Sequence, residues 1–467
     1  MSAAAAAEIR AGLDHPVIDA DGHLIEIPAL FVDALREVAG PSVERRWHRL
    51  TSGEPLDPDA APTPPRQQWP ACAPWYSIPP DAYDRAAGCV PGILHGRLDE
   101  LGIDLSILYP SLGLVLIGLP DDELRQACCR ALNTYIAGVL DGYGDRLLAP
   151  ATIPMVTPDE AIAELDHAVE VLGYRTIMIS SWVERRLADG GTRPDVLALD
   201  SAYDYDPFWR RCAEHRVAVT AHSGTMGNGL RRSPTRYMYN HIGNFAAAGE
   251  GLAKALVFGG VLARFADLRF AFLEGGVGWG VGLLADLVGR WSKRGGDNID
   301  LLDPRHTDWA VVDAALDAHG DPRFTAAAVK QSIRSTGGLA PPPAERDDFV
   351  LCGVSSAAEL AEQFSRAFFF GCEADDPINA IAFDERLVPF GRPVRAVLGS
   401  DLAHWDVLDM RHVMPEAWEL VERDLLTPDQ FRDFSCDNAI RLHAHANPAF
   451  FAGTVVESYV GDFLATA

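Results

Sequence analysis

Eight short apolar runs, each followed by a segment with helical periodicity, predict a (β/α)8 barrel, also called a TIM barrel. The runs are almost continuously apolar, as strands of a parallel sheet covered by helices must be. The chain has 467 residues, of which 48% are hydrophobic, and this is enough for one large barrel with insertions. The sequence therefore predicts a single domain over residues 1–467.

The first apolar run is Val17-Ile18, and it leads into the segment Asp19-Ala-Asp-Gly-His23. Because alternate side chains of a strand share one face, Asp19, Asp21 and His23 are expected to point the same way. A carboxylate and an imidazole two residues apart can bind one divalent cation. The alternative is a strand end whose aspartates cap the helix that follows.

The other strands follow in order along the chain. They are expected at residues 104–109, 147–153, 175–180, 217–222, 268–273, 367–371 and 394–399. Helical spacing predicts helices at about residues 120–143, 207–215, 246–265 and 275–294. One more helix is expected to begin at Thr157-Pro-Asp-Glu160, where Thr157 is a favourable N-cap and proline occupies the first helical position.

Two insertions interrupt the alternation, at about residues 45–91 and 292–362. The first is rich in Pro and Trp, including Trp69 and Trp75, and is expected to cover the active site. A surface wrap or an oligomer contact is the alternative. Because the insertions follow strands one and six, both are expected at the catalytic face, where the strands have their carboxyl ends.

The charge balance excludes several classes of partner. The chain has 40 basic and 66 acidic residues, a net charge of −26, and a sequence pI of about 4.8. Such a field repels phosphate backbones and anionic lipid, so we expect a small-molecule substrate and neither nucleic acid nor membrane. No basic segment precedes the N-terminal alanine run and no apolar run reaches transmembrane length, so the expected location is the cytoplasm.

Polar side chains that can bind metal stand at the expected carboxyl ends of four strands. In strand order they are Asp21 with His23, His222, Glu274, and Asp401 with His404. The chemistry of a barrel lies at these strand ends, so residues far apart in the sequence are expected to meet there. The eight cysteines include no Cys-x-x-Cys pair, and a thiolate zinc site is therefore not predicted.

Six segments extend this pattern beyond single residues. They are Asp19-Ala-Asp-Gly-His23, Thr220-Ala-His-Ser223, Gly259–Phe265, Phe272–Trp279, Gly399-Ser-Asp-Leu-Ala-His404 and Asn438–Leu442. With them the chain, from Ile18 to about Asn447, resembles the amidohydrolase-2 branch of the metal-dependent amidohydrolase superfamily. This branch includes aminocarboxymuconate-semialdehyde decarboxylase and resorcylate-type decarboxylases. The resemblance implies a homodimer.

The resemblance also implies metal ligands at Asp21, His23, His222 and Asp401. Asp21 departs from the family, since many members have a histidine there, and so does Glu274, where the semialdehyde decarboxylase has a histidine. Both departures add carboxylate oxygens, which favour manganese or iron over zinc as the divalent metal ion. A binuclear centre, with Glu274 and His241 as further ligands, is the alternative to one ion.

Four residues are candidates for catalysis, namely Asp401, Glu274, His404 and His241. Asp401 is expected to accept a proton from a metal-bound water. Glu274 has the alternative role of capping the helix after it, and each histidine has the alternative role of a packing residue.

Trp279, Arg231 and Arg236 are candidates for substrate binding. The arginines follow strand five and could hold an anionic substrate through charge-assisted hydrogen bonds, with an exposed surface position as the alternative.

We expect a metal-dependent hydrolase that cleaves an amide, ester or thioester of a bulky, largely apolar carboxylic acid with a metal-activated water. The bulk of the substrate is inferred from the aromatic insertions. Glu274 in place of the histidine of the semialdehyde decarboxylase also argues against proton delivery to carbon. The alternatives are a non-oxidative decarboxylase of an aromatic or unsaturated carboxylic acid, and a metal-bound scaffold without catalysis.

Overall fold

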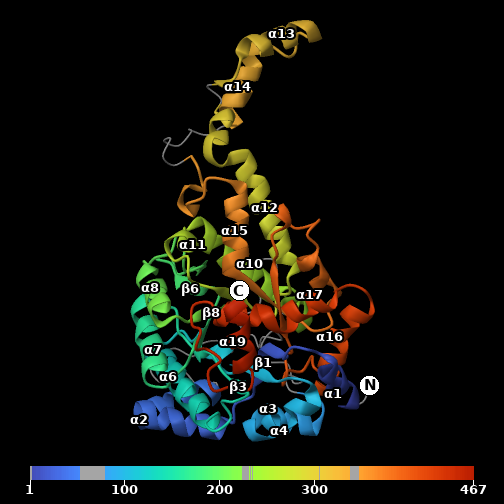
Figure 1. The fold of residues 1–467 in the computed structure, drawn as a ribbon. Coiled ribbons are helices and arrows are strands. Elements are labelled where there is room, and N and C mark those ends of the chain that lie inside the picture. The colour runs from blue at the N-terminus through green and yellow to red at the C-terminus, as the bar shows by residue number, and fades with distance from the viewer. Residues whose placement is uncertain are drawn as a thin grey trace.

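The computed structural model describes residues 3–52, 79–222, 231, 233, 235–303, 306–336 and 346–466. Short parallel strands at the centre are surrounded by helices (Figure 1). The central strands are β1 (Ile18–Leu24), β2 (Leu105–Pro110), β3 (Leu147–Leu148), β4 (Ala151–Thr152), β5 (Thr176–Ile179), β8 (Ala218–Ala221), β9 (Phe270–Phe272), β10 (Phe368–Glu373) and β11 (Arg395–Gly399).

The strand order confirms the predicted TIM barrel. Parallel pairing runs from β1 through β2 to β3, and from β4 through β5, β8, β9 and β10 to β11. β3 and β4 are two pieces of one strand, separated by Ala149 and by Pro150, which has no N–H to donate. Asp401 N donates to Asp21 O (2.9 Å) and His23 N to Leu402 O (3.0 Å), so the end of β11 lies beside β1. All eight predicted strand positions are strands.

Helices cover the barrel in chain order. The first half of the chain contributes α1 (Ala3–Gly12), α2 (Pro28–Ser52), α3 (Ala82–Cys89), α4 (Pro91–Leu101), α5 (Gly113–Leu116), α6 (Asp122–Val139), α7 (Pro158–Glu170) and α8 (Asp206–His215). A hairpin of β6 (Val183–Arg186) and β7 (Thr192–Asp195) precedes α8, where the sequence suggests only a loop.

The second half contributes α9 (Tyr237–His241), α10 (Asn244–Phe258), α11 (Val261–Arg264), α12 (Gly278–Arg294), α13 (Trp309–His319), α14 (Ala326–Thr336), α15 (Ala357–Ala367), α16 (Val413–Glu422), α17 (Pro428–Arg432), α18 (Asn438–His443) and α19 (Glu457–Thr466). Shorter helical turns are η2 (Gly296–Leu302), η5 (Val350–Cys352), η6 (Pro377–Phe383), η7 (Pro389–Gly391), η8 (Met410–His412) and η9 (Asp433–Asp437). The helix expected at 246–265 is divided between α10 and α11, because Gly260 adopts a φ of 71°.

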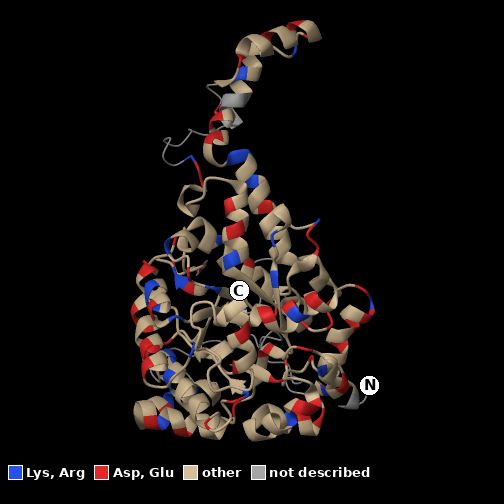
Figure 2. Cartoon of the chain, viewed as in Figure 1, with Lys and Arg blue, Asp and Glu red and all other residues tan. Residues whose placement is uncertain are grey.

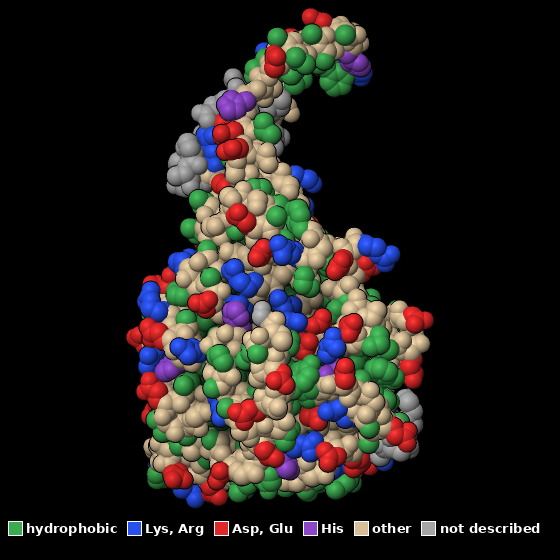
Figure 3. All heavy atoms as spheres, viewed as in Figure 1, with side chains coloured by type: hydrophobic (Ala, Val, Ile, Leu, Met, Phe, Trp, Pro, Cys, Tyr) green, Lys and Arg blue, Asp and Glu red, His purple; other side chains and the backbone are tan. Residues whose placement is uncertain are grey.

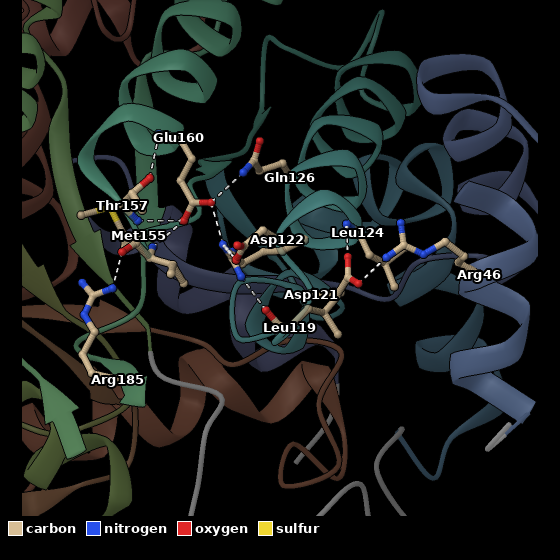
Figure 4. A network of polar contacts seen from close by, with 12 residues as sticks. Arg46, Leu119, Asp121, Asp122, Leu124, Gln126, Met155, Thr157, Glu160 and Arg185 are labelled. Atoms are coloured by element: carbon tan, nitrogen blue, oxygen red, sulfur yellow. Dashed lines mark hydrogen bonds and ion pairs between the residues drawn. The ribbon is translucent and has the colours of Figure 1, made fainter. Parts of the chain in front are cut away.

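Polar contacts join several helices at the barrel surface (Figure 4). Thr157 is the predicted N-cap of α7, and with Glu160 it forms a capping box. The same Glu160 carboxylate accepts from Arg125 Nη2 of α6 at 2.7 Å and from Gln126 Nε2 at 3.1 Å. Arg46 of α2 pairs with Asp121, the N-cap of α6. The half-buried carboxylate of Asp121 thereby joins α2 to α6, and the buried carboxylate of Glu160 joins α6 to α7.

The apolar core has two parts. The larger part lies between the strands and the surrounding helices, and it includes the outward side chains Phe270, Phe272 and Leu398. The smaller part fills the barrel interior. It joins inward strand residues such as Ile18 and Val397 to residues 436–460 of the C-terminal region.

A β-bulge in β1 decides which of its polar residues face the interior. Ile18 and Ala20 point inward, and the register with β2 then shifts between Asp19 and Gly22. The extra residue in β1 turns Asp21 and His23 inward and leaves Asp19 facing outward. The expectation that Asp19 shares the face of Asp21 and His23 is therefore wrong, since it assumed unbroken alternation.

Asp19 ties three strands together. Its carboxylate accepts from Ser106 Oγ of β2 (2.5 Å), and from Ser400 N (2.9 Å) and Ser400 Oγ (2.7 Å) just beyond β11. Burial raises the pKa of Asp19, and these hydrogen bonds oppose the rise. Gly22 must lack a side chain, because a Cβ there would lie 2.6 Å from both Asp19 Oδ2 and Ser106 Oγ.

Residues 53–78 of the first insertion, including Trp69 and Trp75, lie outside the described residues. The described end of this insertion, from residue 79 onward, reaches the catalytic face, where the sequence predicts it. Ile25 N donates to Gly88 O at 2.8 Å, and Gly88 lies against Ala403, which follows β11.

The second insertion, residues 292–362, leaves the barrel from the end opposite to the one expected. α12 begins at Gly278, close to Glu274, and its 17 residues extend about 25 Å away from the carboxyl end of β9. At the far end of the insertion, Cys352 Sγ lies 3.4 Å from Val257 O, near the end of α10, which leads through α11 to the start of β9. The expectation placed the segment directly after strand six, although a complete helix intervenes.

From this amino-terminal end an arm comprising η2, α13 and α14 projects away from the barrel (Figure 1). Acidic and basic residues are interspersed along the arm and over the body (Figure 2). In the described part of the chain, no helix combines the length and the apolar character required to cross a bilayer.

We predict that Asp19→Ala lowers the free energy of unfolding by about 2–4 kcal/mol, because buried donors from Ser106 and Ser400 lose their acceptor. Urea titration followed by circular dichroism measures the change. Asp33→Ala, which removes an exposed carboxylate of α2, is the control and should change it by less than about 0.5 kcal/mol. Equal stabilities of the two variants would contradict the role of Asp19.

Candidate metal centre

Strand ends bring five of the predicted residues into one cluster at the carboxyl end of the barrel. The histidine–carboxylate cluster consists of Asp21, His23, His222, Glu274 and Asp401. β1 supplies Asp21 and His23, and His222, Glu274 and Asp401 follow the last residues of β8, β9 and β11. Convergence of these distant positions is the geometry that the sequence predicts.

Glu274 Oε1 lies at the centre of the cluster. It is 2.9 Å from Nε2 of His23 and 2.9 Å from Nε2 of His222. His23 Nε2 also lies 3.2 Å from Asp401 Oδ1 and 3.7 Å from Asp21 Oδ1. Both histidines are fully buried, so the cluster is shielded from solvent.

Two cluster residues have an unusual backbone conformation. Glu274 has a φ of 52° and Asp401 a φ of 48°, in the left-handed region that residues other than glycine seldom occupy. Such strain persists only where the surrounding structure enforces it, and it is concentrated at functional sites. Here it turns two carboxylates toward the barrel axis as their strands end.

The cluster brings several carboxyl groups, which carry like charges when ionised, close together in a buried position. Burial, with the charge of Glu274 adding to it, raises the pKa of Asp21 and that of Asp401 well above the usual range. Burial also opposes ionisation of Glu274, but His222, His23 and His404 outweigh it and hold the pKa of that carboxyl well below its usual range. Burial, followed by the charge of His404, lowers the pKa of His23 to about 3, so its imidazole is neutral.

A divalent cation fits this set of donors. Two overlapping groups, His23 with Glu274, Asp401 and His404, and Asp21 with His23 and His222, offer ligand atoms that lie within 4.8 Å of one another. Asp21 Oδ1 is buried and has no hydrogen-bond partner among the described residues. Neutral imidazoles and several carboxylates are ligands for a transition metal, and its charge would offset their mutual repulsion.

His404 belongs to the rim of the cluster. Its ring stacks on that of His23 with centroids 3.6 Å apart, and its Nδ1 lies 2.6 Å from Asp401 Oδ1. Its Nε2 lies 3.1 Å from Ser111 Oγ, at the start of the segment after β2. His404 therefore bridges a cluster carboxylate and a hydroxyl, as a positioned acid or base requires.

Glu373 is a neighbour of the cluster that sequence reasoning missed. It is the last residue of β10, and burial, with the charge of Glu274 adding to it, raises its pKa well above the usual range. The predicted strand ended at Gly371, two residues too early. The rule that found the other ligands, a polar residue at a strand end, would have found Glu373 in the sequence Gly-Cys-Glu.

His241 lies at the mouth rather than in the cluster. Its ring is 5.4 Å from those of Phe245 and Trp405, and Phe245 in turn lies 5.4 Å from His222. Burial lowers the pKa of His241, and the charge of Glu274 opposes that shift. Among the described residues His241 joins no group of possible metal ligands, so the geometry does not support its role in a second metal site.

Trp279 lies outside the barrel wall. Its ring packs 5.4 Å from Phe272 and 5.0 Å from Phe370, two outward side chains of β9 and β10. α10 approaches it closely, because a Cβ on Gly249 would meet the Trp279 ring at 3.0 Å. This position between sheet and helix argues against the predicted role in substrate binding.

The two candidate arginines also lie apart from the cluster. Arg231 is exposed and donates to Ile242 O at 3.2 Å, and exposed Arg236 donates to the adjacent Thr235 O at 3.1 Å. Their hydrogen bonds are with their own loop, which favours the alternative of surface arginines.

A third group of possible ligands, Asp166, Glu170 and His215, lies on the helical surface. Arg211 already neutralises it, at 2.6 Å from Asp166 and 2.7 Å from Glu170. Because Arg211 already pairs with its carboxylates, this group is a suitable control site for variants of the cluster.

We predict that the purified protein contains a stoichiometric divalent metal ion and that His222→Ala and Asp401→Asn each lose most of it. Each change removes a donor that the remaining residues cannot replace. Elemental analysis by mass spectrometry gives the metal content. Asp166→Asn should keep the metal, and unchanged content in the two cluster variants would contradict the assignment.

Glu26 is a buried carboxyl outside the cluster, and its ionisation opposes folding. Its Oε2 accepts from Leu112 N at 2.9 Å, and burial raises its pKa to about 8. The folded state thus keeps a proton that the unfolded chain loses near pH 4.5. Between these two pH values, unfolding releases the proton. The contribution of Glu26 to the free energy of unfolding is therefore fully present below about pH 4.5 and is lost as pH rises through about 8.

We predict that Glu26→Gln gains stability relative to the unmodified protein between about pH 5 and about pH 8.5, by up to about 5 kcal/mol. The amide keeps an acceptor for Leu112 N and does not ionise. Urea midpoints of both proteins across this range give the difference. If it is constant with pH, Glu26 is ionised in the folded state.

Comparison with known proteins identifies the family. The Amidohydro_2 model, described as amidohydrolase, matches residues 114–443, more than half of the chain. Among curated proteins, gamma-resorcylate decarboxylase of Rhodococcus jostii (strain RHA1) is 28% identical over 145 residues, which cover 28% of this chain and 43% of that protein. The match thus spans less than half the length of this relative.

Solved structures share the fold. An amidohydrolase from Mycobacterium avium subsp. paratuberculosis K-10 has a TM-score of 0.52 at 16% identity, with 92% of this chain and 100% of that chain covered. A 5-carboxyvanillate decarboxylase from Sphingomonas paucimobilis has a TM-score of 0.51 at 14% identity, with 92% of this chain and 98% of that chain covered. A dihydroxybenzoic acid decarboxylase from Polaromonas sp. JS666 was solved with bound manganese and the inhibitor 2-nitroresorcinol. It has a TM-score of 0.50 at 15% identity, with 92% of this chain and 97% of that chain covered.

The expectation of a hydrolase acting on an amide, ester or thioester is wrong. The curated relative is a resorcylate decarboxylase, and the dihydroxybenzoic acid and carboxyvanillate enzymes named above are also decarboxylases. The expectation depended on two insertions at the mouth, and one of them lies at the opposite end of the barrel. The barrel, the converging strand-end ligands and the matched residues agree, and the chain belongs to the amidohydrolase family Amidohydro_2.

Proposed function

We propose that this protein is a metal-dependent, non-oxidative decarboxylase of an aromatic carboxylic acid, in the class of the hydroxybenzoates. The observation that carries the proposal is the histidine–carboxylate cluster, in which donors from four strand ends surround one point. The resorcylate decarboxylase relative supports the reaction class.

The proposed metal is a single manganese ion, held by Asp21, His23, His222 and Asp401, with Glu274 as a further ligand. The oxygen-rich donor set favours manganese over zinc, and the Polaromonas decarboxylase also binds manganese. A cation bound there supplies the positive charge that holds the carboxylate of the substrate. We also propose that the protein is a homodimer, as the family resemblance suggests.

The chain itself must deliver a proton. In a decarboxylation the bond between the ring carbon and the carboxylate breaks, carbon dioxide leaves, and the ring carbon keeps the electron pair and takes a proton. Asp401 Oδ1 and His404 Nδ1 lie 2.6 Å apart, so either group can carry this proton at the carboxyl end of the barrel. Ser111 Oγ holds the other ring nitrogen of His404 at 3.1 Å and orients the imidazole.

The side chains at the mouth favour a flat substrate. Phe245 lies against His222, and the rings of Tyr237, His241 and Trp405 contact one another within 6.2 Å. Such rings offer faces and edges against which an aromatic acid can pack. They also limit the access of water to the cluster, which strengthens the electrostatic interactions inside it.

The test is release of carbon dioxide from hydroxybenzoates. We predict that manganese-loaded protein converts 2,6-dihydroxybenzoate or a related hydroxybenzoate to the phenol and carbon dioxide. His404→Gln should lower kcat by about a hundredfold while the metal content stays unchanged, because a positioned proton donor is lost. Liquid chromatography of the phenol gives the rate, and elemental analysis gives the metal content.

His412→Gln is the matched control, since it makes the same change at a half-buried histidine whose ion pair within the described part of the chain is with Asp409, at 3.8 Å. It should retain the full rate. Fully metal-loaded protein that releases no carbon dioxide from 2,6-dihydroxybenzoate, 5-carboxyvanillate or their isomers would overturn the proposed reaction. A His404→Gln variant with the full rate would overturn only the assignment of the proton donor.

A further inference from the structure

A cavity of about 270 Å³ lies at the amino-terminal end of the barrel, opposite the histidine–carboxylate cluster. The starts of three neighbouring strands form one wall, with Arg269 just before β9, Phe369 in β10, and Arg395 at the start of β11. The remaining wall consists of Ala266, Asp267, Arg366 at the end of α15, Arg441 of α18, and His445.

The lining of this cavity is strongly basic in a chain of net charge −26. Four arginines face one exposed carboxylate, that of Asp267. Arg441 is the one lining arginine with an acidic partner among the described residues, since it contacts Asp433 at 2.6 Å. Basic side chains gather on the body below the base of the arm (Figure 3), and the lower end of α15 is basic in the ribbon view (Figure 2).

The other three arginines have donors to spare. Arg269 Nη1 donates to the carbonyl oxygens of Ala266 and Leu268, both at 3.0 Å, and Arg395 Nε donates to Ser365 O at 2.9 Å. Arg366 Nε is buried and has no hydrogen-bond partner among the described residues. Each guanidinium has five N–H donors, so most donors of this trio are unused by the described residues.

Gathering these cations is unfavourable without a counter-charge. Burial, followed by the charges of Arg366 and Arg395, lowers the pKa of Arg269 to about 10. Burial and the charge of Arg441 lower the pKa of Arg395 to about 10. A bound anion would reverse both effects, because it would pair the charges and accept the free donors.

We propose that this cavity binds a small molecule bearing a multivalent oxyanion, a phosphate or polycarboxylate group, between Arg269, Arg366 and Arg395. Planar guanidinium groups bind such oxygens through paired hydrogen bonds. The volume exceeds that of the charged group alone, so the cavity also has room for the body of the ligand. This site is separate from the proposed catalytic centre, which lies at the other end of the strands.

Isothermal titration calorimetry of the full-length protein with inorganic phosphate, and separately with tricarballylate, tests the proposal. Sodium chloride at the same ionic strength gives the background. We expect saturable binding of at least one of the two oxyanions and a higher thermal midpoint in its presence. The oxyanion that binds more tightly shows whether the ligand bears a phosphate or a polycarboxylate group.

Arg366→Gln should weaken this binding at least tenfold, and Arg366→Lys, which keeps the charge but loses the planar fork, should have an intermediate effect. The control Arg290→Gln removes an exposed arginine of α12, 3.6 Å from Asp286, and should bind as the unmodified protein does. Circular dichroism verifies that the variants fold. No saturable binding of either oxyanion, or equal binding by Arg366→Gln, would overturn the proposal.

Discussion

The burial of like charges is the constraint on which the catalytic end of this barrel depends. Asp21, Glu274, Glu373 and Asp401 are held within one electrostatic neighbourhood, where solvent cannot separate them. The imidazole of His23, which is neutral because burial lowers its pKa, forms a hydrogen bond with Glu274 but supplies no opposing charge. The strained backbone at Glu274 and Asp401 maintains the arrangement, and a cation at its centre would convert mutual repulsion into coordination.

Local sequence patterns predict most of the fold and the identities of the cluster residues. Buried parallel strands are nearly continuous apolar runs, and a polar residue directly after such a run must lie at the mouth of the barrel. The position of Trp279 was not predictable in this way, because an aromatic residue in the first turn of the helix after a strand can face the mouth or pack against the outside of the sheet. The bulge in β1 was also hidden, because it is a feature of pairing with β2 rather than of composition.

The two ends of the barrel carry opposite charges. Carboxylates gather where the strands end, and arginines gather where β9, β10 and β11 begin. The same strands separate the two groups, so Arg269 and Glu274 lie only five residues apart in the sequence yet belong to different sites. The net charge of −26 does not reveal this separation of charge, because it sums the basic residues of the cavity with the more numerous acidic residues elsewhere.

The inner apolar cluster joins Ile18 in β1 to Ile440 and Phe450, more than 400 residues later in the chain. A ribosome adds roughly 5–20 residues per second, so the two halves of this cluster are made roughly 20–90 seconds apart. During that interval the inward faces of the early strands lack their final partners. The nascent barrel therefore presents apolar surface to the cell until the C-terminal helices emerge, and this is the period in which a chaperone would protect it.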